Sequence, residues 1–312
     1  MDGIIAGVHR TFIAVNTPSH LRAVAQAFLV TFLWSTSWVL IKIGLTDIPA
    51  LTFAGLRYVL AFICLLPFAF RSNHLSALKQ LSRRRWVGLI GLGLLCYAVT
   101  QGTQFVGLAY LPAVTVSLLL TLTAIVVPLL GMFMLAEQPS PRQWIGVGLF
   151  LIGVVIFFNP IVLPAGQVFG FAVVLLGVLT NSLTSILGRR INLGWQLDPL
   201  IVTVVSMGIG ATVLLITGLL IQGLPSLQPI HWGLIAWLAI VNSAFAFTLW
   251  NNTLRTLSAT ESAIINNTML VQIAILAWIF LGEQLTVNKI IGMLFAMIGA
   301  IVVQIKLTHS GR

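Results

Sequence analysis

The chain has 312 residues, of which 59% are hydrophobic and 7% charged, and its formal net charge is +10. Soluble domains carry about a quarter charged residues, so this composition excludes a soluble fold and indicates a membrane protein. The lysines and arginines stand in short loops and at helix ends, where basic residues report membrane orientation and not nucleic-acid binding.

Apolar runs of about twenty residues, long enough to cross a bilayer, follow one another along the chain. They lack the alternation of a barrel strand, which predicts an all-α polytopic membrane protein. Residues 1–23 lack a small-residue cleavage site, so we expect a cytoplasmic leader and not a signal peptide. The predicted helices span residues 24–44, 50–70, 87–108, 112–135, 142–160, 167–187, 199–222, 231–253, 260–281 and 286–306, with a tail at 307–312.

The basic residues lie predominantly on one side of these helices. If the N-terminus is cytoplasmic, the outside loops hold only Lys289, and this asymmetry predicts that both termini are cytoplasmic. The residues expected inside are Arg10, Arg22, Arg71, Lys79, Arg83, Arg84, Arg85, Arg142, Arg189, Arg190, Arg255, Lys306 and Arg312.

Part of the chain recurs at a fixed offset, which indicates two related halves. Each copy is an apolar run, a Glu-Gln turn and a second apolar run with two glycines on one face. The matched residues are Leu111, Ala113, Leu135, Glu137, Gln138, Ile145, Gly146, Ile152 and Gly153 with Leu257, Ala259, Leu281, Glu283, Gln284, Ile291, Gly292, Ile298 and Gly299. We divide the helices into repeats at 24–160 and 161–306. Each repeat has five helices, an odd number, so the second is inverted relative to the first, as in secondary transporters.

The turns and breaks of the repeat carry structural predictions. Glu137 and Glu283 are expected on opposite sides of the membrane, capping the following helix or pairing with Arg142 and Lys289. Pro128 either kinks its helix or is tolerated there. Its counterpart is Ala274, which predicts no matching break in the second copy. We expect close helix packing at the glycine sets Gly88, Gly91 and Gly93, Gly146, Gly148 and Gly153, and Gly292 and Gly299.

These features together resemble one known family. The residues that carry the resemblance are Trp34-Ser35-Thr36-Ser37 followed by Lys42, then Arg57, Ala113 to Leu122 leading to Leu135-Ala136-Glu137-Gln138, Trp144-Ile145-Gly146, and Leu281-Gly282-Glu283-Gln284. The pattern is similar to the EamA-type drug/metabolite transporter (DMT) superfamily over about residues 24–306. This resemblance implies ten transmembrane helices in two inverted five-helix repeats. It also implies export or exchange of small metabolites, often amino acids, across a membrane that we expect to be the bacterial cytoplasmic (inner) membrane.

Polar groups within the predicted helices are costly in lipid and are therefore candidate functional residues. In the first two helices, Lys42 either reaches the headgroups or contacts an anion. Arg57 either anchors to carbonyls of a neighbouring helix or faces the pathway. Trp34 and Trp38 precede Lys42 at intervals of four, on one stripe, as packing residues or as an aromatic cavity wall.

Further candidates lie in the third helix and in the second half. Tyr97, Gln101 and Gln104 share one helical face, which we expect to point into the bundle, towards a cavity or another helix. The second half offers Asn181, Trp250, Asn266 and Asn267. Adjacent amides at 266 and 267 point about 100° apart, so both avoid lipid only if the helix is enclosed or locally unwound. Mutual amide bonds without a ligand are the alternative.

Other function classes lack their residues. The sequence has no His-Glu-x-x-His motif, carboxylate cluster or Ser/His/Asp set, so we expect no enzyme activity, catalytic residues, metal or cofactor. None of the six acidic residues falls near the middle of a predicted helix, which favours a uniporter or exchanger over proton coupling. The predicted partners are a small-molecule substrate and the lipid bilayer, with no nucleic acid, for a monomer or homodimer. Exchange of phosphorylated metabolites is the alternative function, but it calls for cationic clamps.

Overall fold

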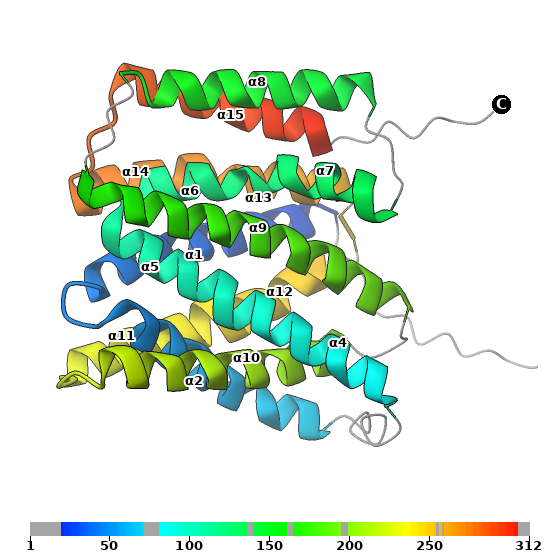
Figure 1. Cartoon of the computed structure of the whole chain (residues 1–312), viewed down its shortest axis with the longest axis vertical. Coiled ribbons are helices and arrows are strands. Elements are labelled where there is room, and N and C mark those ends of the chain that lie inside the picture. The colour runs from blue at the N-terminus through cyan, green and yellow to red at the C-terminus, as the bar shows by residue number, and fades with distance from the viewer. Residues whose placement is uncertain are drawn as a thin grey trace, which may run out of the picture.

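The computed structural model describes residues 20–71, 81–135, 140–160, 165–194, 199–253, 256–257 and 259–304. Every regular element in these ranges is a helix, and no described residue forms a strand. The predicted all-α class is therefore confirmed. The helices lie side by side with roughly parallel axes, and α1 begins at the same end of the bundle at which α15 ends (Figure 1).

The first half of the chain forms five helical rods, where a rod is one helix or a succession of helices that runs once along the bundle. These are α1 (His20–Gly44), α2 (Ala50–Arg71), a continuous rod of α4 (Arg83–Gly93), the π-helical η1 (Leu94–Thr100) and α5 (Gln101–Tyr110), then α6 (Ala113–Thr121) with α7 (Thr123–Leu135), and α8 (Pro141–Phe157).

The second half has the same order of elements. Its rods are α9 (Ala165–Gly194), α10 (Pro199–Gln222), a continuous rod of α11 (Pro229–Ala239), the π-helical η2 (Ile240–Phe245) and α12 (Ala246–Thr253), then α13 (Ala259–Asn267) with α14 (Met269–Leu281), and α15 (Val287–Gln304).

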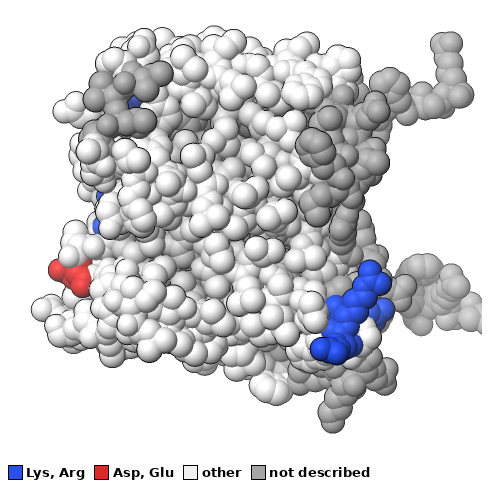
Figure 2. Space-filling view, in the orientation of Figure 1, with Lys and Arg blue, Asp and Glu red and all other residues white. Residues whose placement is uncertain are grey.

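These helices have the length and composition of membrane spans. Within the described ranges, nine helical spans are long and apolar enough to cross a membrane, and α8 is a shorter apolar helix. Charged side chains are few on the visible face: a basic group lies over the start of α4, where the sequence reads Arg83-Arg84-Arg85, and an acidic group lies at the opposite edge (Figure 2). The chain is an integral membrane protein by these criteria, because monomeric soluble proteins rarely expose large contiguous apolar surfaces.

The two halves share their irregular segments as well as their helices. The π-helices begin at Leu94 and Ile240, and the interrupted rods break at Leu122 and Thr268, so both pairs are separated by 146 residues. At each break the backbone N–H bonds the carbonyl three residues earlier, from Leu122 to Leu119 and from Thr268 to Ile265. The prediction of no matching break was therefore wrong. The prediction was based on Pro128, which lies inside α7. The shared break is instead a tightened turn six residues earlier.

Helices at equivalent positions of the two halves pack antiparallel to each other. Gln143, in the first turn of α8, donates a hydrogen bond from Nε2 to the carbonyl of Val303 at the end of α15 (3.3 Å). At the opposite end, the start of α15 meets the end of α8, where Asn288 Nδ2 donates to the carbonyl of Asn159 (3.0 Å). Similarly, Leu51 N at the start of α2 donates to Gln222 Oε1 at the end of α10 (2.8 Å).

Glycines bring the backbones of α8 and α15 into direct contact. A Cβ on Gly153 would lie 2.5 Å from the backbone nitrogen of Ala296, and one on Gly146 would lie 2.8 Å from the carbonyl oxygen of Gly299. These positions fit the expected close packing. A Cβ on Gly148, in the same helix, would have no neighbour within 4 Å, so that glycine is not required by packing.

Large side chains fill the end of the bundle where α1 turns into α2. Ile41, Ile48, Phe53, Phe105 and Leu108 are all at most 1% exposed. The rings of Phe53 and Phe105 pack edge to face with centroids 5.3 Å apart. This packed layer fills the interior of the bundle at that end.

Candidate functional site

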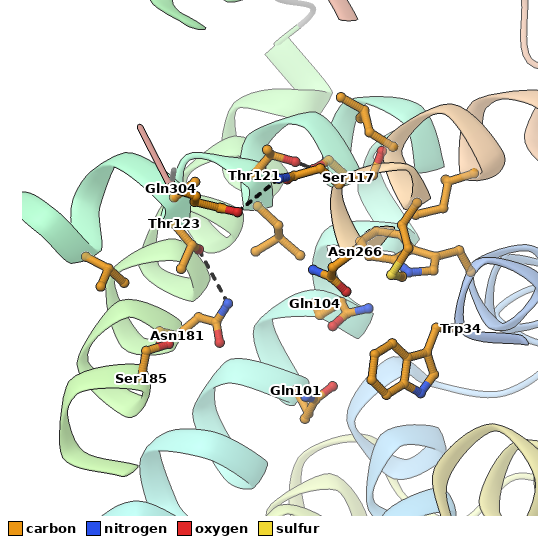
Figure 3. Close-up of a pocket in the computed structure, with 18 of the residues that line it drawn as sticks. Trp34, Gln101, Gln104, Ser117, Thr121, Thr123, Asn181, Ser185, Asn266 and Gln304 are labelled. Atoms are coloured by element: carbon orange, nitrogen blue, oxygen red, sulfur yellow. Dashed lines mark hydrogen bonds between the residues drawn. The ribbon is translucent and has the colours of Figure 1, made fainter. Parts of the chain in front are cut away.

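A cavity of about 640 Å³ lies between the two halves. Its volume falls in the range of about 300–1,000 Å³ typical of small-molecule sites. Helices of both halves contribute to it, and Figure 3 shows side chains from several of them converging on one space. The lining residues are Trp34, Ser37, Trp38, Arg57, Tyr58, Gln101, Gln104, Ser117, Leu120, Thr121, Thr123, Ala124, Val127, Pro128, Gln143, Asn181, Ser185, Phe247, Asn266, Asn267, Met269, Leu270, Ile273, Val303 and Gln304.

The cavity reaches the end of the bundle that holds the start of α8 and the end of α15. Gln143 and Gln304, at those helix ends, belong to the lining. At the other end the lining stops before the packed layer around Phe53 and Phe105. The described residues therefore form a site that is closed on one side of the bundle and extends towards the other.

Equivalent positions of the two halves both contribute to the cavity lining. The pairs, each separated by 146 residues, are Gln101 with Phe247, Leu120 with Asn266, Thr121 with Asn267, Thr123 with Met269, Ala124 with Leu270, and Val127 with Ile273. In three of these six pairs one member is polar and the other apolar. The shared backbone thus gives a pseudo-symmetric cavity, and the side chains give it distinct polar and apolar walls.

Amides dominate the polar part of the lining. Gln101 Oε1 accepts a hydrogen bond from the Tyr58 hydroxyl (2.6 Å), and Asn267 Nδ2 donates to Gln304 Oε1 (3.0 Å). Gln104 and Asn266 also project into the cavity (Figure 3), and neither has a hydrogen-bond partner among the described residues. These two amides offer both donors and acceptors to a bound solute.

A second polar corner lies on α9. Asn181 Nδ2 donates to Thr123 Oγ1 at 3.4 Å, and the exposed Ser185 lies one turn further along the helix (Figure 3). Ser185 Oγ is bonded to the carbonyl of Asn181 (2.9 Å), which leaves its oxygen as an acceptor. Asn181 and Ser185 come from the second half and Thr123 from the first, so this corner joins the halves.

An aromatic cluster forms the apolar wall. The Trp34 ring packs against Phe247 (centroids 5.2 Å apart) and Trp250 (5.3 Å). Trp34 and Phe247 line the cavity, whereas Trp250 does not and supports Trp34 from behind. Trp38, 7% exposed, contributes to the lining one turn further along α1. Offset ring contacts of this kind hold the Trp34 indole in a fixed orientation.

The π-helical segment η2 positions two of the lining residues. Its Asn242 carbonyl accepts a hydrogen bond from Trp34 Nε1 (3.1 Å), and the Asn242 amide donates back to the carbonyl of Leu33. The neighbouring Ser243 hydroxyl accepts from Arg57 Nε (3.2 Å). A π-turn leaves carbonyls out of the regular helical ladder and commonly marks functional sites. Here it fixes one residue from each of α1 and α2.

Arg57 is 5% exposed, and the residue belongs to the cavity lining. The group lies over the ring of Tyr58, 5.1 Å from its centroid, and 5.9 Å from that of Phe105. Arg57 was predicted either to anchor to carbonyls or to face the pathway. In the structure its Nε bonds a hydroxyl, and the residue belongs to the cavity lining.

Three of the predicted site residues lie outside the cavity lining. Tyr97 is in the core, where its ring packs against Tyr58 (5.8 Å), because η1 shifts the helical register and separates it from the face of Gln101 and Gln104. Trp250 lies behind Trp34. Lys42 is not part of the cavity lining, and its Nζ bonds the carbonyls of Leu108 (2.5 Å) and Leu111 (2.8 Å).

Glu137 and Glu283 were expected to cap the helix that follows each turn or to pair with Arg142 and Lys289. Glu137 lies outside the described residues. Glu283 does not cap the following helix; its carboxylate instead reaches α6 in the other half, where it accepts from Ala113 N (2.5 Å) and Val114 N (3.1 Å). Lys289 Nζ bonds the carbonyl of Gln284 (2.9 Å). The prediction for Glu283 was wrong in its partner because a turn motif does not reveal contacts between halves.

Several lining residues were not among the predicted ones. Gln143 and Gln304 stand at helix ends, where sequence reasoning assigns glutamines to solvent. Tyr58 follows Arg57 directly, and it can be recognised as a lining residue only when this part of α2 is known to be enclosed. Phe247 is apolar and was not predicted; its equivalence to Gln101 in the repeat is the sequence signal that could have identified it as a lining residue. Among the described residues no group of three His, Cys, Asp or Glu is arranged to hold a metal ion.

Comparison with known proteins identifies the family. The model of the EamA-like transporter family matches residues 21–159 and again residues 168–305. The chain is 25% identical to "Uncharacterized transporter YoaV" of Bacillus subtilis over 284 residues, which is 86% of this chain and 92% of that protein. It is 26% identical to "Uncharacterized inner membrane transporter YedA" of Escherichia coli K12 over 272 residues, 84% of this chain and 83% of that one.

Two further similarities are informative in different ways. A "Probable amino-acid metabolite efflux pump" of Salmonella typhimurium is 30% identical over 134 residues, 43% of this chain and 42% of that protein. A solved crystal structure shares the fold with a TM-score of 0.65 at 20% identity, covering 91% of this chain and 98% of that one. The two family matches account for nearly all of the membrane helices described above, and the resemblance predicted from the sequence is confirmed: this chain belongs to the EamA-like transporter family.

Proposed function

We propose that this protein is a secondary transporter that moves small polar metabolites, amino acids or related compounds, across a membrane by alternating access. The substrate binds in the central cavity between the two repeats, and net transport is export. The observation that carries this proposal is the 640 Å³ cavity, which has a polar and an apolar wall and lies between antiparallel halves of one transporter-family chain.

The proposed architecture is ten transmembrane helices in two inverted five-helix repeats, at residues 24–160 and 161–306. The antiparallel packing of α8 on α15 and of α2 on α10 supports this arrangement, as does the 146-residue spacing of the π-helices. Inverted repeats exchange conformations to open a central site alternately to either side. A cavity closed at one end and extended towards the other is one of the two states that such a cycle requires.

The chemistry of the lining favours a neutral or zwitterionic solute. Its polar groups are chiefly amides and hydroxyls, and Arg57 is the one cation in the described lining. A phosphorylated metabolite, the alternative substrate, calls for several cationic groups. The name of the Salmonella relative mentions amino-acid metabolites, and that similarity covers 43% of this chain.

We place the protein in a bacterial cytoplasmic membrane with both termini inside. The name of the Escherichia coli relative contains "inner membrane". The basic residues at the start of α4 lie at the end of the bundle where α1 begins (Figures 1 and 2), consistent with a cytoplasmic surface. The described cavity lining holds no Asp, Glu or His, so we propose a uniporter or exchanger and not a proton-coupled pump.

Efflux from proteoliposomes tests the proposal. Vesicles containing the purified protein and loaded with the twenty amino acids should release at least one of them faster than protein-free vesicles. Ala124→Trp fills the cavity and should abolish this release. Leu179→Trp, on a 44% exposed side chain of α9 outside the lining, is the matched control and should retain it. Equal release with and without protein, or full activity of Ala124→Trp, would contradict the proposal.

A further inference from the structure

The guanidinium of Arg57 has more hydrogen-bond donors than partners. An arginine side chain carries five N–H donors. The only hydrogen bond that the described residues provide is from Nε to Ser243 Oγ, at 3.2 Å. The remaining four N–H groups belong to the two terminal nitrogens, and the residue is 5% exposed at the wall of the cavity. The face of the guanidinium fork that best matches a carboxylate is thus left open.

No carboxylate among the described residues balances this charge. Asp47, Glu261 and Glu283 are the described acidic residues. Asp47 lies 3.5 Å from His231, Glu261 bonds His20 at 2.7 Å, and Glu283 caps α6. A charge removed from water without a partner costs several kcal/mol. The aromatic rings of Tyr58 and Phe105 offset part of this cost but provide no acceptor in the plane of the group.

The other cation predicted as an anion contact is already satisfied. Lys42 Nζ donates to the carbonyls of Leu108 and Leu111, and the carboxylate of Glu283 attracts it electrostatically. These contacts hold the end of α5 next to the start of α6, outside the cavity. Of the two cations predicted as anion contacts, only Arg57 is both enclosed and available to a solute.

We propose that Arg57 binds the carboxylate of the transported solute, so that the substrate class is compact carboxylates such as amino acids. This inference rests on the proposed transport function and assigns its substrate class. The carboxylate lies against the guanidinium, with its two oxygens on the two terminal nitrogens or on Nε and one of them. The oxygens of the free amides Gln104 and Asn266 accept from an ammonium group where the solute has one.

Contacts with Ser243 and Tyr58 fix the orientation of the guanidinium before a solute binds. Nε is fixed to Ser243, whose own hydroxyl donates to the carbonyl of Leu238 (3.0 Å), a bond that spans five residues in the π-helical segment. The ring of Tyr58 restrains one face. Ordering the long arginine side chain in advance reduces the entropy lost on binding, so the contact contributes more to affinity than a mobile lysine does.

The test compares acids with their amides in one vesicle preparation. Proteoliposomes are loaded with an equimolar mixture of the twenty amino acids, their α-carboxamides, glucose 6-phosphate and glycerol 3-phosphate, and efflux of each compound is followed by mass spectrometry. A charge-assisted hydrogen bond contributes about 1.5–3 kcal/mol, so the wild type should release a transported amino acid at least about tenfold faster than its carboxamide. Arg57→Gln should remove this preference. Arg84→Gln, at an exposed arginine in the first turn of α4, is the matched control and should keep it.

A second measurement does not depend on the folding of a variant. Phenylglyoxal modifies arginines, and peptide mapping by mass spectrometry reports the rate at Arg57 separately from the others. The transported amino acid should slow modification of Arg57 in the wild type and leave that of Arg84 unchanged, whereas the carboxamide should protect neither.

The outcomes separate this inference from the function on which it rests. Release of amino acids and carboxamides at equal rates, release of sugar phosphates in their place, or an unchanged preference in Arg57→Gln would overturn the assignment of Arg57 and leave transport standing. Release of no compound from the loaded mixture would overturn the transport proposal, and this inference with it.

Discussion

The carboxylate of Glu283 accepts a hydrogen bond from the backbone N–H of Ala113, at 2.5 Å. The two residues are 170 positions apart and belong to different halves of the chain. Glu283 also accepts from Val114, so a single carboxylate satisfies two of the free N–H groups at the start of α6. Through this contact the turn of one repeat closes the end of the bundle formed by the other.

Removal of this carboxylate should loosen the closed end. We expect Glu283→Ala to lower the free energy of unfolding by about 1 kcal/mol, the usual cost of losing a helix cap. Thermal unfolding of the purified protein in detergent measures the effect. Gln284→Ala changes the neighbouring exposed side chain and should leave the midpoint unchanged. Equal midpoints for the two variants would show that the contact does not stabilise the fold.

The seam between α8 and α15 offers a second matched pair. A methyl group on Gly153 would lie 2.5 Å from the nitrogen of Ala296, so Gly153→Ala forces the helices apart. Overpacking of this kind costs about 1–3 kcal/mol. Gly148→Ala, where no atom lies within 4 Å of the added carbon, should be neutral or slightly stabilising. Thermal unfolding compares the two, and a Gly153→Ala protein as stable as Gly148→Ala would refute the close contact.

The amides of the cavity should be required for transport and not for folding. We expect Gln101→Leu and Asn267→Leu to abolish efflux, because each removes a polar side chain from the lining. Size-exclusion chromatography should still show folded protein. Gln167→Leu, in the first turn of α9 outside the lining, provides the same chemical change as a control. Efflux at the wild-type rate would remove the affected residue from the site.

The hydrogen bond from Trp34 to η2 should matter for the shape of the apolar wall. Trp34→Phe keeps an aromatic ring but loses the indole N–H that bonds the carbonyl of Asn242. We expect a several-fold lower efflux rate at subsaturating substrate, since the ring is no longer oriented. Trp144→Phe, on the exposed face of α8, should transport normally. The idea is refuted if both variants behave alike.

Much of the fold could be predicted from the sequence. The repeat of apolar runs around the two Glu-Gln turns indicated two halves, and the predicted helix boundaries lie close to those observed. Trp34, Gln101 and Asn267 were identified because polar or bulky groups in the middle of an apolar helix have no role in lipid. They line the cavity in the structure.

The remaining features depend on contacts that a single sequence does not reveal. The π-helix at Leu94–Thr100 shifts Tyr97 away from the face of Gln101, and no residue type in this segment requires a π-turn. Lys42 and Glu283 bond backbone groups of distant helices. Backbone groups are the same in almost every residue, so the sequence does not identify these partners. The matching break at Thr268 has no proline or glycine to mark it. In each case packing between helices decides the local conformation.

A solute that crosses the membrane through this protein passes through the cavity, which should therefore be accessible to water. Labelling of a cavity thiol measures this access. In a background that lacks Cys64 and Cys96, Ser185→Cys should react with a charged, membrane-impermeant thiol reagent, and efflux should fall in proportion to labelling. Ser182→Cys, at a fully buried position of the same helix, should remain unlabelled. An unreactive thiol at position 185, or complete labelling with undiminished efflux, would contradict the account.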